Sequence, residues 1–260
     1  MQIAEIPSDM SRYYPPEYYS FSSDFSRTSP EQMKAKAQFM INTYLSGMDV
    51  SDSRILDVGC GSGSYVYALK ELGVKQVLGV DPYIQQTIEY DNSATVRKDT
   101  IYGIDQQWDL IMFNHSFEHL SDPAQTLRKV SGLLSEGGVC MIRIPTVSSY
   151  AWEHYGVDWV QLDAPRHFFL YSVESMNMLA EAAGLALTHV LYDSTAFQFY
   201  GSELYKRDIP LFASDAIPAS SVFSQSQMEM FETISQQLNE QNRGDQAAFY
   251  LRQGAGFSHP

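Results

Sequence analysis

One short stretch, residues 57–63 with the sequence DVGCGSG, carries much of the chemistry that the chain shows. It combines one carboxylate, Asp57, with three glycines at alternate positions. A turn built of glycines has no side chains to block the approach of a ligand to the backbone. A second carboxylate, Asp81, ends the next apolar run, where a carboxylate can bind the two hydroxyls of a ribose. The pattern predicts a binding loop for a nucleotide-like ligand.

Two ligands of that kind are the main alternatives, a dinucleotide and S-adenosylmethionine. A dinucleotide loop needs the spacing G-x-G-x-x-G, so that a pyrophosphate lies at the N-terminus of the helix that follows. Here Ser64 stands in place of the third glycine. The charge of Asp57 would repel a pyrophosphate, whereas it suits the ammonium group of a methionine. The residues favour S-adenosylmethionine; a nicotinamide oxidoreductase and a glycine turn without a ligand are the alternatives.

The string D-x-G-x-G-x-G at 57–63, followed by Asp81 and Pro82, resembles the signature of class I S-adenosylmethionine-dependent methyltransferases. The resemblance implies a Rossmann-like α/β fold. Its sheet would have seven mainly parallel strands, helices on both faces and an antiparallel strand 7. It also implies S-adenosyl-L-methionine as the cofactor and S-adenosyl-L-homocysteine as the product.

The same resemblance implies which residues bind the cofactor. Asp81 would hold the ribose hydroxyls, Pro82, Tyr83 and Ile101 would flank the adenine, and Asp99 would accept from its amino group. A solvated turn aspartate is the alternative for Asp99. The expected cofactor-binding residues are Asp57, Gly59, Cys60, Gly61, Gly63, Asp81, Pro82, Tyr83, Asp99, Thr100, Ile101, Asn114 and His115.

Strands and helices alternate along the chain, which predicts a mainly parallel sheet with helices on both faces. We expect strands at 54–58, 76–80, 94–98, 108–114, 139–144, 185–192 and 247–252, and helices at 29–46, 64–72, 83–90, 123–134, 172–183 and 224–241. If the resemblance holds, 247–252 is the antiparallel strand. The preceding segment, 193–246, is then an insertion, because about fifty residues are too many for a hairpin.

The predicted order of strands and helices divides the chain into two parts, and the second part contains two further regions. Residues 1–50 would form an N-terminal arm and a helix that cap the site, and 51–260 would form the methyltransferase domain. Within it, residues 145–171 are rich in Tyr, Trp and His and predict a lid that excludes water from an apolar or sugar-like acceptor. We expect the insertion 193–246 to be a partly helical flap beside the site.

A hydroxyl acceptor needs a base to take its proton, and a histidine is the usual choice at neutral pH. His167 is the first candidate, because Asp163 and Arg166 lie near it in sequence; His115 is second and His154 third. A structural or surface histidine is the alternative for each. The expected acceptor-binding residues are Tyr13, Tyr14, Trp152, His154, Arg166 and Tyr171, and Tyr18 and Tyr19 belong to the same tyrosine-rich arm.

Residues 115–119 read H-x-x-E-H, which matches a metallopeptidase pattern. That pattern needs a helix long enough to present both histidines on one face. Here it follows a buried strand, and Ser121-Asp122-Pro123 soon begins another helix. We therefore expect Glu118 and His119 to fix this turn, and we expect no metal.

The amino-acid composition disfavours some classes of binding partner. The 260 residues carry 17 basic and 31 acidic side chains, a net charge of -14, which disfavours nucleic acid and anionic membranes. Two cysteines and no secretory signal fit a reducing, cytoplasmic compartment. We expect a monomer or homodimer without membrane insertion. The string DAPRHFFLYS at 163–172 resembles a segment of bacterial methyltransferases of glycan and secondary-metabolite pathways, and this resemblance implies a hydroxyl of a sugar, glycan precursor or secondary metabolite as the acceptor. A quinone-like lipid or protein acceptor, or a non-catalytic cofactor-binding homologue, is the alternative.

Overall fold

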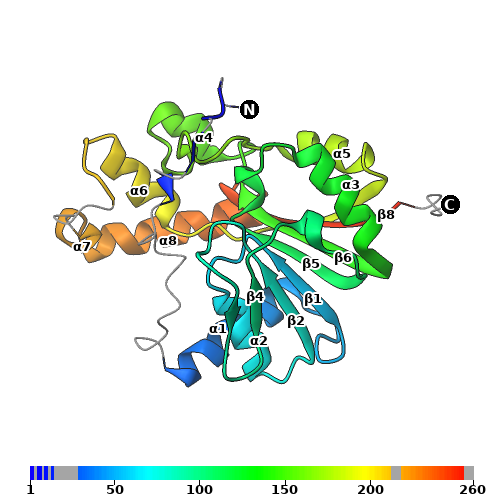
Figure 1. Cartoon of the computed structure of the whole chain (residues 1–260). Coiled ribbons are helices and arrows are strands. Elements are labelled where there is room, and N and C mark those ends of the chain that lie inside the picture. The colour runs from blue at the N-terminus through cyan, green and yellow to red at the C-terminus, as the bar shows by residue number, and fades with distance from the viewer. Residues whose placement is uncertain (3–4, 8, 11–12, 15–28, 212–217, 255–260) are drawn as a thin grey trace.

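The fold is an eight-stranded sheet with the strand order β3-β4-β2-β1-β5-β6-β8-β7 (Figure 1). The computed structural model of the chain describes residues 1–2, 5–7, 9–10, 13–14, 29–211 and 218–254. Five strands form the parallel centre, and β1 lies between β2 and β5. They are β1 (Arg54–Val58), β2 (Gln76–Val80), β4 (Thr95–Arg97), β5 (Trp108–Asn114) and β6 (Leu134–Pro145). This confirms the predicted α/β class.

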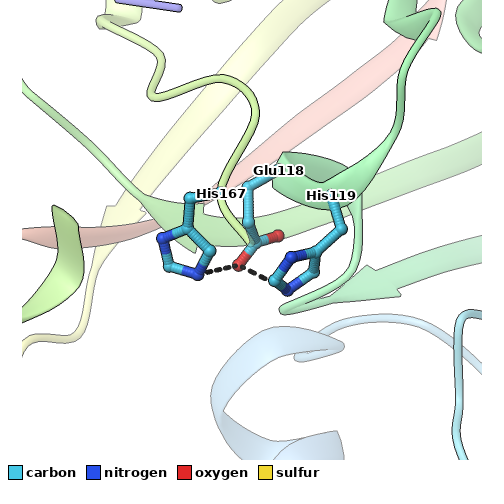
Figure 2. A group of neighbouring side chains, drawn as sticks. All are labelled: Glu118, His119 and His167. Atoms are coloured by element: carbon cyan, nitrogen blue, oxygen red, sulfur yellow. Dashed lines mark ion pairs between the residues drawn. The ribbon is translucent and has the colours of Figure 1, made fainter. Parts of the chain in front are cut away.

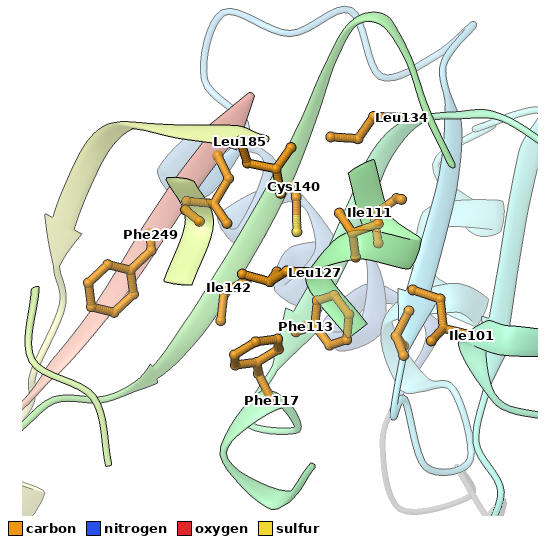
Figure 3. Packing of buried hydrophobic residues seen from close by; sticks show 14 of the residues in the cluster. Ile101, Ile111, Phe113, Phe117, Leu127, Leu134, Cys140, Ile142, Leu185 and Phe249 are labelled. Carbon is orange, nitrogen blue, oxygen red and sulfur yellow. The ribbon is translucent and has the colours of Figure 1, made fainter. Parts of the chain in front are cut away.

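Helices cover both faces of the sheet because the central strands are apolar on both sides. In β5, Ile111 and Phe113 face one hydrophobic cluster, while Leu110 and Met112 face the other. The first cluster includes residues of α3 (Pro123–Leu133) and α5 (Val173–Glu181), and Figure 3 shows its packing around Phe113, Phe117 and Leu127. The second includes residues of α1 (Pro30–Tyr44) and α2 (Ser64–Glu71).

The last strand closes the sheet in the antiparallel sense that the resemblance implies. Strand β8 (Gln246–Gln253) pairs antiparallel with β6 on one side and with β7 (Leu185–Tyr192) on the other. The chain therefore leaves the sheet at its edge after β7 and returns between β7 and β6.

The predicted helix at 83–90 is wrong, and so is the strand count of seven. Residues Ile88–Glu89 form β3, which pairs antiparallel with β4. Ser93 adopts a φ of 65°, and the Tyr90 N–H donates to the Ala94 carbonyl at 2.9 Å, so a hairpin turn brings the chain back. β-branched Thr87 and Ile88 suit such a strand better than a short helix.

Residues 145–171 pack with the described residues 193–211 and 218–246 beside the sheet. They contain α4 (Tyr150–Tyr155), α6 (Phe197–Tyr205), α7 (Ala219–Val222) and α8 (Gln225–Glu240). Buried Trp159, Phe199 and Phe231 belong to one cluster that joins these elements, which lie together at one end of the sheet (Figure 1). Among the described residues there are also short 3-10 helices, namely η3 (Ile101–Gly103), η4 (Phe117–His119), η5 (Gly156–Asp158) and η6 (Val160–Leu162).

None of the helices within the described ranges has both the length and the apolar character needed to cross a membrane.

Candidate active site

The glycine loop between β1 and α2 has a backbone that other residues adopt only with strain. Gly59, Gly61 and Gly63 have φ values of 72°, 57° and 82°. A side-chain carbon added to Gly59 would also lie 2.9 Å from the hydroxyl oxygen of Ser116. That hydroxyl donates to the Val58 carbonyl at 2.6 Å. The loop therefore presents backbone rather than side chains to a ligand.

Two buried carboxylates flank the loop, as the sequence predicts. Asp81 accepts hydrogen bonds from the backbone N–H of Gly61 at 2.9 Å and of Tyr83 at 2.8 Å, which ties the loop to the end of β2. Asp57 is 3% exposed, and no hydrogen bond reaches its carboxylate from the part of the chain that the structure describes. Burial, and then the charge of Asp81, raise the pKa of Asp57 to about 7.

Lys36 is a site residue that the sequence analysis missed. It comes from α1, and its Nζ donates to the Ser64 hydroxyl at 3.2 Å and lies 4.6 Å from the centre of the Tyr65 ring. Its charge acts to lower the pKa of Asp57, against the effects of burial and Asp81. Nothing in the sequence of an amphipathic helix tells which of its lysines reaches the glycine loop.

The N-terminal arm reaches the expected adenine side of the site. The Tyr14 ring stacks on the half-exposed Tyr83 ring, with centroids 5.0 Å apart and planes at 15°. The Tyr14 hydroxyl lies 3.1 Å from Nδ1 of His119. Of its neighbours, Tyr13 is also described, whereas Tyr18 and Tyr19 lie outside the described residues.

The other residues expected around the adenine lie at the ends of β2 and β4. Asp99 forms an ion pair with Arg97 and accepts from the Thr100 N–H at 2.8 Å, so its carboxylate is engaged by its own turn. Ile101 is buried in the hydrophobic core. Pro82 follows Asp81 directly, and Cys60 is a free cysteine within the glycine loop.

A buried carboxylate surrounded by histidines lies beyond the end of β5. Glu118 of η4 is fully buried, and its Oε1 lies 3.6 Å from Nδ1 of His115, 4.0 Å from Nε2 of His119 and 3.8 Å from Nε2 of His167. Figure 2 shows His119 and His167 on either side of this carboxylate. Burial alone would raise the pKa of Glu118, but the neighbouring histidines, His119 foremost, outweigh burial and bring the pKa to about 2. We name Glu118, His119 and His167 the Glu118 cluster.

The two histidines expected to act as bases differ in their surroundings. His115 has a left-handed φ of 53°, and its Nε2 accepts from the Arg143 guanidinium at 2.7 Å. His167 is 6% exposed, and its Nδ1 donates to the Gln161 carbonyl at 2.8 Å. Its Nε2 lies 3.6 Å from Oδ2 of Asp163 as well as facing Glu118. Burial lowers the pKa of His167.

Arg143 organises a polar network that the sequence analysis did not identify. Its guanidinium donates to the side-chain oxygen of Asn114 at 3.1 Å and to Oδ2 of Asp193 at 2.6 Å. The Tyr44 hydroxyl donates to the same Asp193 oxygen. Arg143 lies in β6, and an arginine inside an apolar run near the end of a strand was the available signal for this network.

The expected acceptor-binding residues fall into two groups. Arg166 forms an ion pair with Asp163 at 2.7 Å, and Tyr171 is buried against Phe117, so both lie near the Glu118 cluster. Trp152 instead packs beside Trp159, and exposed His154 stacks on Tyr150. No hydrogen bond, ion pair or ring contact within the described ranges joins Trp152 or His154 to that cluster.

Comparison with known sequences identifies one family model, described as a methyltransferase domain, that matches residues 27–190. Two curated relatives match shorter parts. A tRNA U34 carboxymethyltransferase of Campylobacter hominis is 26% identical over 101 residues, which cover 35% of this chain and 35% of that protein. A ribosomal protein L11 methyltransferase of Glaesserella parasuis is 37% identical over 54 residues, or 21% and 18% of the two chains. The chain thus spans only a minor part of these two relatives.

Solved structures match over more of the chain. A SAM-dependent methyltransferase from Archaeoglobus fulgidus has a TM-score of 0.50 at 18% identity, covering 94% of this chain and 99% of that one. The mycolic acid cyclopropane synthase CmaA1, complexed with SAH and CTAB, has a TM-score of 0.54 at 19% identity, covering 91% and 90%. At these identities the likeness shows a shared fold.

Proposed function

The chain belongs to the class I S-adenosylmethionine-dependent methyltransferases, and from this premise we propose that it methylates a hydroxyl group of a small molecule. The acceptor class is a sugar, a glycan precursor or a secondary metabolite. The observation that carries the proposal is buried Asp57, which accepts no hydrogen bond from the described residues and lies beside a backbone-lined glycine loop that suits one end of the cofactor. S-adenosylmethionine supplies, when bound, a methyl group already activated by a positively charged sulfur.

The residues of the loop fit this cofactor chemically. The carboxylate of Asp57 suits the ammonium group of the methionine moiety, because a buried charge without a partner is costly. Asp81, at the end of β2, is placed to bind the ribose hydroxyls, and its two backbone hydrogen bonds hold it in position. Tyr83 offers an exposed ring for the adenine, and Tyr14 covers that ring from the arm.

We assign the base to His167. Its Nδ1 donates to the Gln161 carbonyl, so the neutral ring keeps its lone pair on Nε2. The proton of the acceptor hydroxyl passes to Nε2 while the hydroxyl oxygen forms its bond to the methyl carbon. Carboxylates of Glu118 and Asp163, at 3.8 and 3.6 Å from Nε2, stabilise the imidazolium that results. His115 is the weaker candidate, because its Nε2 already accepts a hydrogen bond from Arg143.

A small acceptor agrees with the charge and the lid better than a nucleic acid does. The net charge of -14 opposes the binding of a phosphate backbone, which requires clustered lysine and arginine. The lid carries aromatic side chains around Trp152 and Tyr171, which suit an apolar or sugar-like molecule. The relatives named for tRNA match between 35% and 55% of this chain, so tRNA is retained as the second acceptor to be tested.

Two measurements test the proposal. Calorimetry with S-adenosylhomocysteine should show micromolar binding that Gly61→Arg abolishes, while Gly132→Arg, at an exposed position of α3, leaves it intact. The absence of heat with the wild-type protein would contradict the cofactor assignment. Incubation with methyl-labelled cofactor and fractionated cell extract should place the label in the small-molecule fraction. Label found only in tRNA, or only in protein, would contradict the acceptor class.

A further inference from the structure

The Glu118 cluster has hydrogen bonds that fix which ring nitrogens carry protons. Nδ1 of His119 donates to the Arg166 carbonyl at 2.8 Å, and Nδ1 of His167 donates to the Gln161 carbonyl, because a carbonyl oxygen can only accept. In the neutral rings, both Nε2 atoms therefore carry lone pairs. Both face Oε1 of Glu118, at 4.0 and 3.8 Å (Figure 2).

The carboxylate at the centre of the cluster lacks partners of its own. Glu118 is 0% exposed, and neither of its oxygens has a hydrogen-bond partner in the described part of the chain. Two nitrogen lone pairs and a carboxylate oxygen that converge on one point repel one another unless a positive charge lies between them. The ligand atoms of the three side chains all lie within 4.8 Å of one another.

The geometry points to a divalent transition-metal ion, with zinc as the best match, bound by Glu118, His119 and His167. Two imidazoles and one carboxylate are a ligand set of zinc sites that keep an open fourth position. Bonds of about 2.0–2.2 Å to a tetrahedral ion would place the ligand atoms roughly 3.4 Å apart. The present separations of 3.8 and 4.0 Å need to shorten by about half an ångström.

The groups around the cluster support the same assignment. Histidines that bind metals donate their other ring N–H to a carbonyl or carboxylate, as His119 and His167 do here. His115 has the opposite tautomer: its Nε2 accepts from Arg143, so its Nδ1–H faces Glu118 at 3.6 Å as an outer partner of the carboxylate. The ligands come from η4 and from the lid, so the ion would join the two.

The metal site itself does not depend on the proposed function. Only the role of the ion in the reaction rests on it. With zinc bound, Nε2 of His167 cannot also accept the acceptor proton. A bound ion would make the acceptor hydroxyl more acidic, and water would take its proton. His167 would then serve as a ligand, so its role as the base holds for the protein without the ion. The sequence analysis expected no metal because it considered His115 and His119 on one helix and did not include His167.

The test measures metal binding apart from activity. Protein stripped with a chelator is titrated with Zn²⁺, and zinc is counted by mass spectrometry after desalting; Co²⁺ reports tetrahedral coordination by its visible absorption. We expect one ion per chain, with an affinity that falls at least about 100-fold in Glu118→Gln. His115→Asn should weaken it about 10- to 100-fold. His189→Ala, which removes an exposed histidine of β7, should leave binding unchanged.

Circular dichroism and thermal melting check that each variant folds, and His119→Asn replaces Glu118→Gln if the latter does not. Substoichiometric zinc in the wild type, or equal binding in the ligand variants, would overturn the inference and leave a proton as the occupant of the cluster. Binding of S-adenosylhomocysteine, measured on the same samples, reports on the proposed function separately.

Discussion

Gly59 and Ser116 are in direct contact across the end of the sheet. A β-carbon on Gly59 would lie well inside 3.0 Å of the Ser116 side chain, a separation that real β-carbons do not adopt. Ser116 cannot turn away without losing its 2.6 Å hydrogen bond to the Val58 carbonyl. The contact fixes the glycine loop against the segment that carries His115 and Glu118. The cofactor loop and the Glu118 cluster are thereby held in one geometry.

Gly59→Ala should therefore destabilise the fold and abolish cofactor binding. Overlap with Ser116 and a φ of 72° together should lower the free energy of unfolding by about 2–4 kcal/mol. Gly132→Ala, an exposed position of α3 with no atom within 4 Å, should raise it by up to about 1 kcal/mol. Urea denaturation measures the free energy of unfolding of both variants. Equal stability of the two variants would show that the contact does not constrain the loop.

Cofactor affinity should rise with pH through the titration of Asp57. Its folded-state pKa of about 7 means that the empty site holds a proton below that pH, while the ammonium group needs the ionised carboxylate. Affinity for S-adenosylhomocysteine should improve about tenfold from pH 6 to pH 8. Calorimetry between pH 6 and pH 8 measures how this affinity changes with pH. Asp57→Asn should make the affinity independent of pH. A flat profile in the wild type would mean that Asp57 does not meet the ammonium group.

Lys36→Met should move that pH dependence upward. The Lys36 charge lowers the pKa of Asp57, so its loss leaves the carboxyl protonated to higher pH. Affinity at pH 7 should fall about two- to fivefold and recover at higher pH. Lys34→Met provides the matched control, because Lys34 pairs with Glu71 on the surface at 3.9 Å. An equal loss of affinity in Lys34→Met and Lys36→Met would argue against an electrostatic effect on Asp57. An affinity of Lys36→Met that stays low at higher pH would argue against it too.

Tyr14→Ala should speed the release of the cofactor. The Tyr14 ring stacks on Tyr83 and would cover the adenine side, so its removal should raise the dissociation rate of S-adenosylhomocysteine about 3- to 10-fold. Tyr14→Phe keeps the ring and loses the hydroxyl that contacts His119, and it should release the product at nearly the wild-type rate. Stopped-flow fluorescence separates the two. If Tyr14→Ala released S-adenosylhomocysteine at the wild-type rate, the arm would pack there for stability alone.

His167→Ala should reduce turnover without weakening cofactor binding. Loss of the base, or of a zinc ligand, removes the means to ionise the acceptor hydroxyl, and turnover should fall about 100-fold or more. Calorimetry with S-adenosylhomocysteine should give the wild-type affinity, because His167 lies outside the glycine loop. His189→Ala should match the wild type in both assays. If His167→Ala kept the wild-type turnover, His167 would be neither the base nor a ligand of a catalytic zinc ion.

Much of the fold could be predicted because glycines and prolines mark the ends of its elements. Gly73 follows α2, Pro123 begins α3, and Gly184 precedes β7, and the predicted bounds of these elements differ from the structure by few residues. Strand β3 could not be predicted, since two residues of strand show no period. Helices α4 and α6 were also missed, because their aromatic faces pack against each other rather than against the sheet.

The candidate site was predictable only where its residues are close in sequence. Asp57, the glycines and Asp81 belong to one βαβ unit, so their spacing reveals the loop. The Glu118 cluster joins His167 to a turn some fifty residues earlier, and a contact over such a separation leaves no pattern in one sequence. Lys36 and Asp193 come from other distant elements and reach the site by packing alone.

The position of β8 has a consequence for the order in which the molecule is completed. As a ribosome extends the chain, β6 and β7 emerge before the strand that separates them in the sheet. Each then has an edge whose backbone groups await hydrogen bonds, and such edges invite pairing with other chains. Strand β8 satisfies both edges when it pairs with β6 on one side and with β7 on the other. That pairing also places Asp193, which follows β7, beside Arg143 of β6.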